Sequence, residues 1–166
     1  MLLFINRVSD SFSPECRIMV VQSLVLSCLN YCLKVWGSTN KTQLTRISKI
    51  QNFAAKVAAG GARKYDHVTP IYGKLKWLRM GEKYVYEVCL LVFKILHNHL
   101  PDWLFVLPTA AQTRGGSIIT RNQNTLYVPR IKTDAGSRAL SVIGPKLWNN
   151  LPMNVVTHYS LLKEIS

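Results

Sequence analysis

The side chains best suited to catalysis are scarce in this chain. Eight of its 166 residues are acidic, namely Asp10, Glu15, Asp66, Glu82, Glu87, Asp102, Asp134 and Glu164. Two-metal reactions need carboxylates that lie close enough to bridge two divalent ions. No two of these acidic residues are adjacent, so the chain has no Asp-Asp pair. We therefore expect no two-metal active site and no catalysis by this chain alone.

Cysteine and histidine offer a second kind of chemistry, which is metal binding. Cys28 and Cys32 would share one helix face, and His97 and His99 are close in the sequence, so a Cys2His2 set can be drawn on paper. Histidines two residues apart on a helix face different ways, so one ion could hold both only if the helix broke there. The sequence predicts no metal and no cofactor, and it favours the cysteines as small core residues. It also contains no P-loop, no nucleophile elbow and no placed Cys/His pair.

Positive charge is the most abundant chemical feature. The formal net charge is +13 and the isoelectric point is near 9.9. This balance favours polyanionic partners such as nucleic acid. Between Lys34 and Lys83 the acidic residues are only Asp66 and Glu82, although basic residues are frequent there.

The basic residues form two candidate sets for phosphate contacts. The first set lies on and just after a helix predicted over residues 40–60, and its members are Arg46, Lys49, Lys56, Arg63 and Lys64, which Lys74, Lys76 and Arg79 could extend. The second set lies in the tail around Tyr127, and its members are Arg121, Arg130 and Arg138, with Arg114 and Lys132 beside them. A basic helix face can follow a phosphate backbone, and a basic segment with an aromatic residue can hold a single strand. Two simpler interpretations stay open: a solvated helix face for the first set, and caps that pin an irregular segment for the second.

The apolar stretch over residues 18–36 does not have the composition of a membrane span. A spanning helix needs about 20 mostly apolar residues. Here Ser23, Ser27, Asn30 and Lys34 interrupt the stretch at helical spacing, which is typical of a mostly buried helix with a narrow polar stripe. The four cysteines come without a signal sequence, so we expect a reducing compartment inside the cell, nucleus or cytoplasm, and no membrane partner.

Hydrophobic periodicity and capping residues predict a mainly α-helical fold. Ser13-Pro14-Glu15 is a helix start, and this helix should run to Trp36 and stop at Gly37. Further helices are predicted over residues 40–60, 69–78 and 80–99. The first of these should bury one face, made of Leu44, Ile47, Gln51, Ala54, Ala55 and Ala58.

The composition changes after Pro108. Residues 109–124 are polar and are expected to form an exposed connection, while the β-prone residues 125–128 should pair with residues 118–120. Residues 134–143 and 145–150 should be brief helices separated by a sharp turn at Gly144-Pro145, with Asn149 bonding local backbone. The tryptophans Trp36, Trp77, Trp103 and Trp148 are predicted core anchors.

Together these elements predict two parts. A helical domain occupies residues 1–108, and an irregular basic tail with short strands and helices occupies residues 109–166. The expected total is about four to six helices with a short β hairpin or an irregular C-terminal segment.

Several motifs also occur in one particular order. The tail over residues 126–152 contains L-Y-V-P-R, T-D-A-G-S-R-A-L-S-V and G-P-K-L-W-N-N-L-P. Earlier blocks are S-C-L-N-Y-C-L-K-V-W-G, R-I-S-K-I-Q-N-F-A-A-K-V-A-A-G, L-K-W-L and L-P-D-W-L. This order resembles the region that follows the palm in the reverse transcriptases of jockey-type and CR1-type non-LTR retrotransposons, and the resemblance covers nearly the whole chain.

The resemblance implies a thumb-like domain that contacts the template or primer backbone of an RNA–DNA hybrid, beside the rest of a reverse transcriptase. The aromatic-x-Asp-Asp motif of that family is absent, so the implied function is that of a non-catalytic nucleic-acid-binding fragment. The resemblance also implies that the chain is truncated at both ends relative to the family. At the start of the long helix, Lys83 stands where the family pattern has arginine. Two other interpretations stay open: a helical scaffold for a protein partner, and a relic without function.

Overall fold

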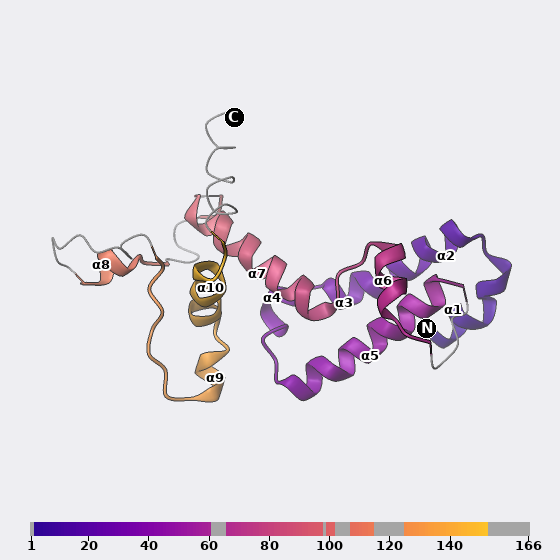
Figure 1. The fold of residues 1–166 in the computed structure, drawn as a ribbon, viewed down its shortest axis with the longest axis horizontal. Helices are drawn as coiled ribbons and strands as arrows, with labels where there is room; N and C mark the ends of the chain where they lie inside the picture. The colour runs from indigo at the N-terminus through magenta and orange to yellow at the C-terminus, as the bar shows by residue number, and fades with distance from the viewer. Residues whose placement is uncertain (1, 61–65, 98, 102–106, 115–124, 153–166) are drawn as a thin grey trace, which may run out of the picture. The chain divides into compact units, whose positions relative to one another are not determined.

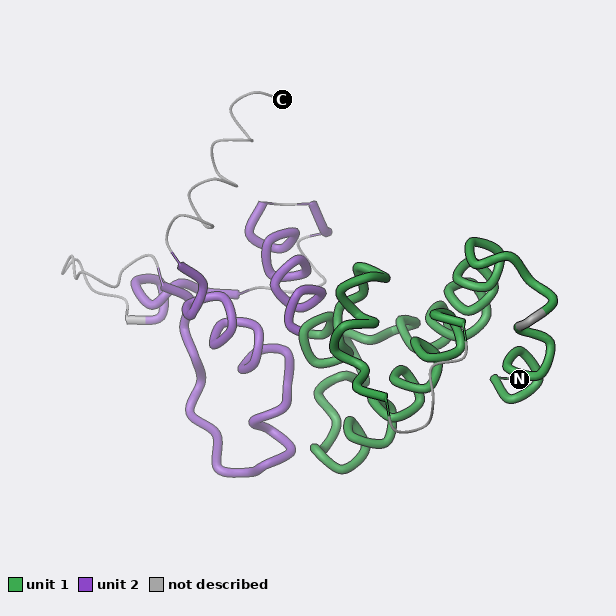
Figure 2. Tube along the Cα trace, turned by 45° about the vertical axis from the view of Figure 1, so that its right-hand side comes forward, with its two compact units in different colours: residues 1–84 green, residues 85–166 purple. Residues whose placement is uncertain are grey.

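A computed structural model describes residues 2–60, 66–97, 99–101, 107–114 and 125–152, and their backbone is mainly helical, as predicted (Figure 1). The chain divides into two compact units, residues 1–84 and residues 85–166 (Figure 2). The domain boundary predicted at residue 108 therefore falls inside the second unit.

The first unit begins with α1 (Leu2–Val8), a 3-10 turn (Ser9–Ser11) and α2 (Pro14–Val21). The predicted start of α2 is confirmed, because the Ser13 hydroxyl accepts a hydrogen bond from the Cys16 N–H at 3.3 Å and proline follows the cap.

The single helix predicted from Ser13 to Trp36 is wrong. After α2 the chain forms a π-helical turn, η2 (Gln22–Leu26), then α3 (Ser27–Asn30) and, after a break, α4 (Leu33–Trp36). At the break Tyr31 has ψ 124° and Cys32 has φ +50°, which no α-helix allows.

Polar side chains inside this segment explain the irregular backbone. The Ser23 hydroxyl donates to the Val20 carbonyl, and the Ser27 hydroxyl donates to the Ser23 carbonyl. Such bonds compete with the backbone ladder and bend helices. The break also leaves the Tyr31 carbonyl available to Trp36, whose Nε1–H donates to it at 2.7 Å.

The helix α5 (Lys41–Ala58) is the centre of the first unit. Asn40 caps it, since its Oδ1 accepts from the Gln43 N–H at 3.0 Å. The predicted inner face is confirmed: Gln51, Ala54, Ala55 and Ala58 are buried, and Leu44 and Ile47 are half-buried.

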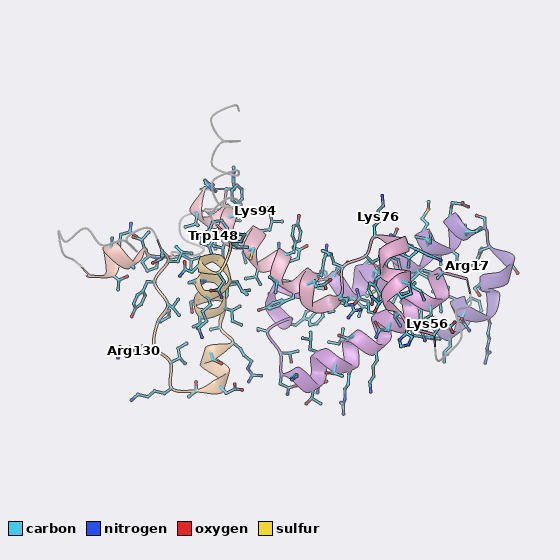
Figure 3. The ribbon with its side chains drawn as sticks, in the orientation of Figure 1. Arg17, Lys56, Lys76, Lys94, Arg130 and Trp148 are labelled. Atoms are coloured by element: carbon cyan, nitrogen blue, oxygen red, sulfur yellow. The ribbon has the colours of Figure 1, made fainter. Side chains whose placement is uncertain are left out.

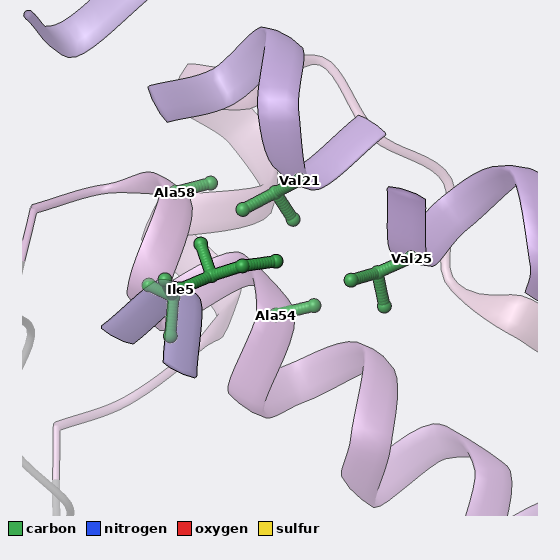
Figure 4. Packing of buried hydrophobic residues seen from close by; sticks show 6 residues of the cluster. Ile5, Val21, Val25, Ala54 and Ala58 are labelled. Atoms are coloured by element: carbon green, nitrogen blue, oxygen red, sulfur yellow. The ribbon is translucent and has the colours of Figure 1, made fainter. Parts of the chain in front are cut away.

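The main core of this unit forms where α1, α2 and η2 cover α5. Ile5, Val21 and Val25 pack against the alanines of α5 and against Val57 (Figure 4). Small residues on α5 let the neighbouring segments approach closely, and the covering residues supply the apolar area that stabilises the contact.

The helix α6 (Thr69–Leu75) ends three residues before the predicted end at Leu78. Lys76 has φ +53°, and the Trp77 N–H donates to the Tyr72 carbonyl at 3.1 Å, as in a Schellman helix end. Ile71 and Tyr72 of α6 form a second small core with Ala55.

The helix α7 (Met80–Leu96) begins with one of the two bonds of a capping box, since the Glu82 carboxylate accepts from the Arg79 N–H at 3.0 Å. It stops before the predicted end at residue 99. The loop between α6 and α7 is tied to α5 by Gln51, which is only 4% exposed. Its Nε2 donates to the Leu78 carbonyl at 2.9 Å, and its Oε1 accepts from the Met80 N–H at 2.8 Å.

The second unit contains the rest of α7 and three shorter helices, α8 (Ala110–Arg114), α9 (Asp134–Ser137) and α10 (Leu140–Asn149). Thr109 and Leu126 form an isolated antiparallel bridge, and no longer strand occurs in the part of the chain that the structure describes. The strand partner predicted over residues 118–120 lies outside the described residues.

The sharp turn predicted at Gly144-Pro145 is wrong, because α10 continues through both residues. Gly144 serves close packing instead: a Cβ atom there would lie 3.0 Å from Cγ2 of Val92, on α7. Pro145 is fully buried inside the helix despite its missing N–H.

The predicted local bonding of Asn149 is also wrong. Its Oδ1 accepts from the Leu126 N–H at 3.0 Å, and its Nδ2 donates to the Leu126 carbonyl at 2.9 Å. The side-chain amide of Asn149 thus bonds both backbone groups of Leu126, as a residue of a neighbouring strand would. Leu126 also pairs with Thr109 in the isolated bridge.

Candidate nucleic-acid interface

The outward face of α5 carries two of the predicted phosphate contacts. Arg46 and Lys49 are both exposed, and they lie on the side of the helix away from the buried Gln51 and Ala54. Because an α-helix rises about 1.5 Å per residue, they stand roughly 4.5 Å apart along the axis. This separation is shorter than the screening length of about 8 Å at physiological salt, so their fields add.

The charge of α5 is of one sign along its whole length. Its sequence contains Lys41, Arg46, Lys49 and Lys56 and no acidic residue. Lys41 is exposed at the first helical position and was not among the predicted contacts. Lys41 could have been predicted as a contact from the sequence, because it directly follows the Asn40 cap of a helix that contains no acidic residue.

Lys56 differs from Arg46 and Lys49 because it is half-buried, in the last turn of α5. A cation at this position interacts favourably with the negative end of the helix dipole, which gives Lys56 a structural role.

Arg17 of α2, which the sequence did not single out, reaches the same end of α5 (Figure 3). A side chain at Gly60 would collide with Nη1 of Arg17. Nη2 of Arg17 donates to the Phe12 carbonyl at 3.2 Å. The C-terminal end of α5 therefore gathers two cations from different helices.

Three other predicted contacts, Arg63, Lys64 and Arg121, lie outside the described residues, and their roles stay predictions. The proposed extension of the first set is partly structural. Nη2 of Arg79 donates to the Thr69 hydroxyl at 2.7 Å, and its guanidinium lies 5.8 Å from the centre of the Tyr72 ring. Burial raises the pKa of Tyr72 to about 12, so this phenol stays neutral next to Arg79 at physiological pH.

In the second unit, the two described members of the tail set have different surroundings. Arg130 is exposed on the extended segment before α9 (Figure 3). Arg138 forms an ion pair with Asp134 of α9, with 3.3 Å between Nη2 and Oδ2. An exposed pair of this kind contributes less than about 1 kcal/mol, so it orients Arg138 without removing it from solvent.

The prediction that the cysteines are small core residues is wrong for three of them, because Cys16, Cys28 and Cys32 are exposed, while Cys89 is half-buried. No group of three or more histidine, cysteine or acidic side chains that could hold a metal ion occurs within the described ranges. The rings of His97 and His99 lie 6.5 Å apart beyond the end of α7. Burial raises the pKa of the Cys89 thiol, which lowers its thiolate fraction and its reactivity. No described helix is long and apolar enough to cross a membrane.

No protein-family model matches this sequence, and neither a curated protein nor a solved structure matches it. The class of protein therefore rests on the motifs of the sequence and on the chemistry of the basic surface.

Proposed function

We propose that this chain binds nucleic acid through the phosphate backbone, without reading base sequence, as the part of a non-LTR retrotransposon reverse transcriptase that follows the palm. The observation that carries the proposal is the exposed pair Arg46 and Lys49 on a helix without acidic residues. The motif order over residues 27–152 supports the retroelement assignment.

The inner and outer faces of α5 have different roles, and these roles suit the proposed function. The inner face of α5 holds the helix to the core through its alanines. The two hydrogen bonds of the Gln51 side chain, to the Leu78 carbonyl and the Met80 N–H, are here called the Gln51 clamp, and they add to this attachment. Because the backbone of α5 is already ordered, binding costs little further backbone entropy. Each phosphate that a cation neutralises releases counterions and makes affinity depend on salt.

Catalysis has no part in the proposal. The eight acidic residues are dispersed, and the described ones include no metal-binding cluster. In this proposal the chain holds the nucleic-acid duplex, and another part of the polymerase carries out the synthesis.

The experiment is a binding titration of a short RNA–DNA hybrid over a salt series, with Arg46→Glu/Lys49→Glu beside the wild type. We expect the variant to bind at least tenfold more weakly at low salt. The plot of log affinity against log salt has a negative slope, and this slope should become shallower by about 2, since two phosphate contacts are lost.

The matched control is Lys94→Glu/Lys146→Glu, which changes the net charge by the same amount at two exposed lysines outside both candidate sets. It should lose much less affinity than the α5 variant. Equal losses would show that net charge alone holds the nucleic acid, and unchanged affinity of the α5 variant would exclude this face.

A protein-binding scaffold is the second candidate, and exposed apolar side chains favour it. Leu3 and Phe4 of α1 are 69% and 67% exposed, and Met19 of α2 is 68% exposed. Under this alternative, Phe4→Ser should abolish binding to a protein partner, and that binding should depend only weakly on salt.

A further inference from the structure

The first unit contains a pocket of about 360 Å³ between η2, α3 and the segment that joins α6 to α7. Its volume falls within the range of roughly 300–1,000 Å³ that holds small organic ligands. Gln51 lines it on the inner face of α5, so the pocket is distinct from the outward face that carries Arg46 and Lys49.

The lining of this pocket combines three kinds of group. Trp77 supplies an aromatic surface, Gln22 and Asn30 supply exposed side-chain amides, and Lys76 and Lys83 supply positive charge. None of the described residues that line the pocket is acidic. Amides and an indole suit a planar heterocycle with polar edges, and the lysines suit an attached phosphate.

Lys76 occupies a backbone position that normally favours glycine. Its φ of +53° places it in the left-handed region at the end of α6. The Schellman end of α6 accounts for this conformation, and it fixes the direction in which the Lys76 side chain leaves the backbone. Figure 3 shows the Lys76 side chain extending away from the ribbon, where its ammonium can meet an anion.

The clamp by Gln51 shapes the wall of the pocket. Both polar ends of this side chain are occupied, by the Leu78 carbonyl and the Met80 N–H. Gln51 is therefore a positioning residue, and the groups that can recognise a ligand are those of Gln22, Asn30, Trp77 and Lys76.

We propose that this pocket binds one nucleotide, with the base against Trp77 and the amides and the phosphate at Lys76. The nucleotide is either a free nucleoside monophosphate or the 5′-terminal residue of a strand, since both present the same base and phosphate. This site does not depend on the proposed function, because it uses none of the exposed cations of α5.

The test is isothermal titration calorimetry of the whole chain with each of the four nucleoside 5′-monophosphates and with a 5′-phosphorylated oligonucleotide. We expect saturable binding of one nucleotide per chain. Lys76→Asn removes the charge but keeps a residue that tolerates the left-handed backbone, and it should weaken binding roughly tenfold. Lys74→Asn, in the last turn of α6 and outside the pocket, is the control and should bind like the wild type.

Each outcome decides the proposal. Saturable binding that Lys76→Asn weakens supports it, and comparison of the monophosphates with the oligonucleotide identifies the source of the nucleotide. Absence of binding to every probe by the folded wild type overturns it, as does inorganic phosphate binding as tightly as the nucleotides. The Arg46→Glu/Lys49→Glu protein should keep this binding even if it loses the hybrid, which separates the two proposals.

Discussion

Gln51 gives the sharpest test of how the first unit is held together. Gln51→Met keeps nearly the same volume but removes both hydrogen bonds to the loop between α6 and α7. Met80 is 1% exposed, so its N–H would lose its partner in a site that water does not reach. Such an unsatisfied group costs about 1–3 kcal/mol.

The second bond of Gln51 is worth less than the first. Leu78 is 47% exposed, so water can replace the amide at its carbonyl, and only the net value of a hydrogen bond, about 1 kcal/mol, is lost. The expected total is a loss of about 2–4 kcal/mol in the free energy of unfolding.

Gln51→Glu adds a pH dependence whose sign can be worked out. A carboxylate accepts from the Met80 N–H but cannot donate to the Leu78 carbonyl, whereas the protonated acid can do both. Burial disfavours the charged form, so the folded-state pKa of this glutamate should lie above its unfolded value of about 4.3. The stabilising protonated form is then fully present below about pH 4, and its contribution is lost as pH rises through the folded pKa.

The assay is urea unfolding followed by far-ultraviolet circular dichroism at neutral and acidic pH. Gln43→Met is the control, because Gln43 lies on the same helix but is exposed, and it should change stability by less than about 0.5 kcal/mol. If Gln51→Met is as stable as Gln43→Met, the clamp contributes nothing and the reasoning fails. A Gln51→Glu deficit that does not shrink on acidification would contradict the assigned direction of the Leu78 bond.

Two further outcomes follow from contacts of single side chains. Asn149→Asp should lower the free energy of unfolding at neutral pH by about 1–2 kcal/mol, because a carboxylate cannot donate to the Leu126 carbonyl; urea unfolding beside Asn150→Asp, at an exposed neighbour, checks this, and equal stability of the two variants would contradict it. Burial raises the pKa of Tyr72 to about 12 from its ordinary value of 10, so the stability that comes from the neutral phenol is fully present below about pH 10 and is lost as pH rises toward 12. Unfolding curves over this pH range should show the wild type losing more stability than Tyr72→Phe, and parallel losses would refute the assignment.

Features that depend on near neighbours in the chain were predictable from the sequence. The caps at Ser13 and Asn40 each bond an N–H three residues ahead, so residue type and spacing identify them. The inner face of α5 follows from the helical period, and the same period predicts that Arg46 and Lys49 face away from the core.

Some signals were present in the sequence but were given another interpretation. Asp134 and Arg138 stand four residues apart, which is the spacing of an ion pair on one helix turn. Ser23 and Ser27 were assigned to a polar stripe on a continuous helix, whereas their hydroxyls bond backbone carbonyls where the helix becomes irregular.

Long-range contacts decided the rest. Gln51 meets Leu78, Asn149 meets Leu126 and Gly144 meets Val92 across 23 or more residues of sequence. The same is true of Arg17, whose approach to Gly60 adds a second cation at the end of α5. The amino-acid sequence by itself determined that the fold is mainly helical, where α2 and α5 begin, which face of α5 is apolar and that the net charge is positive, because these depend on composition and on residues within a few positions. Only the tertiary structure decided which polar side chains bond distant backbone groups and which stay exposed to solvent, because that depends on the residues that folding brings beside them.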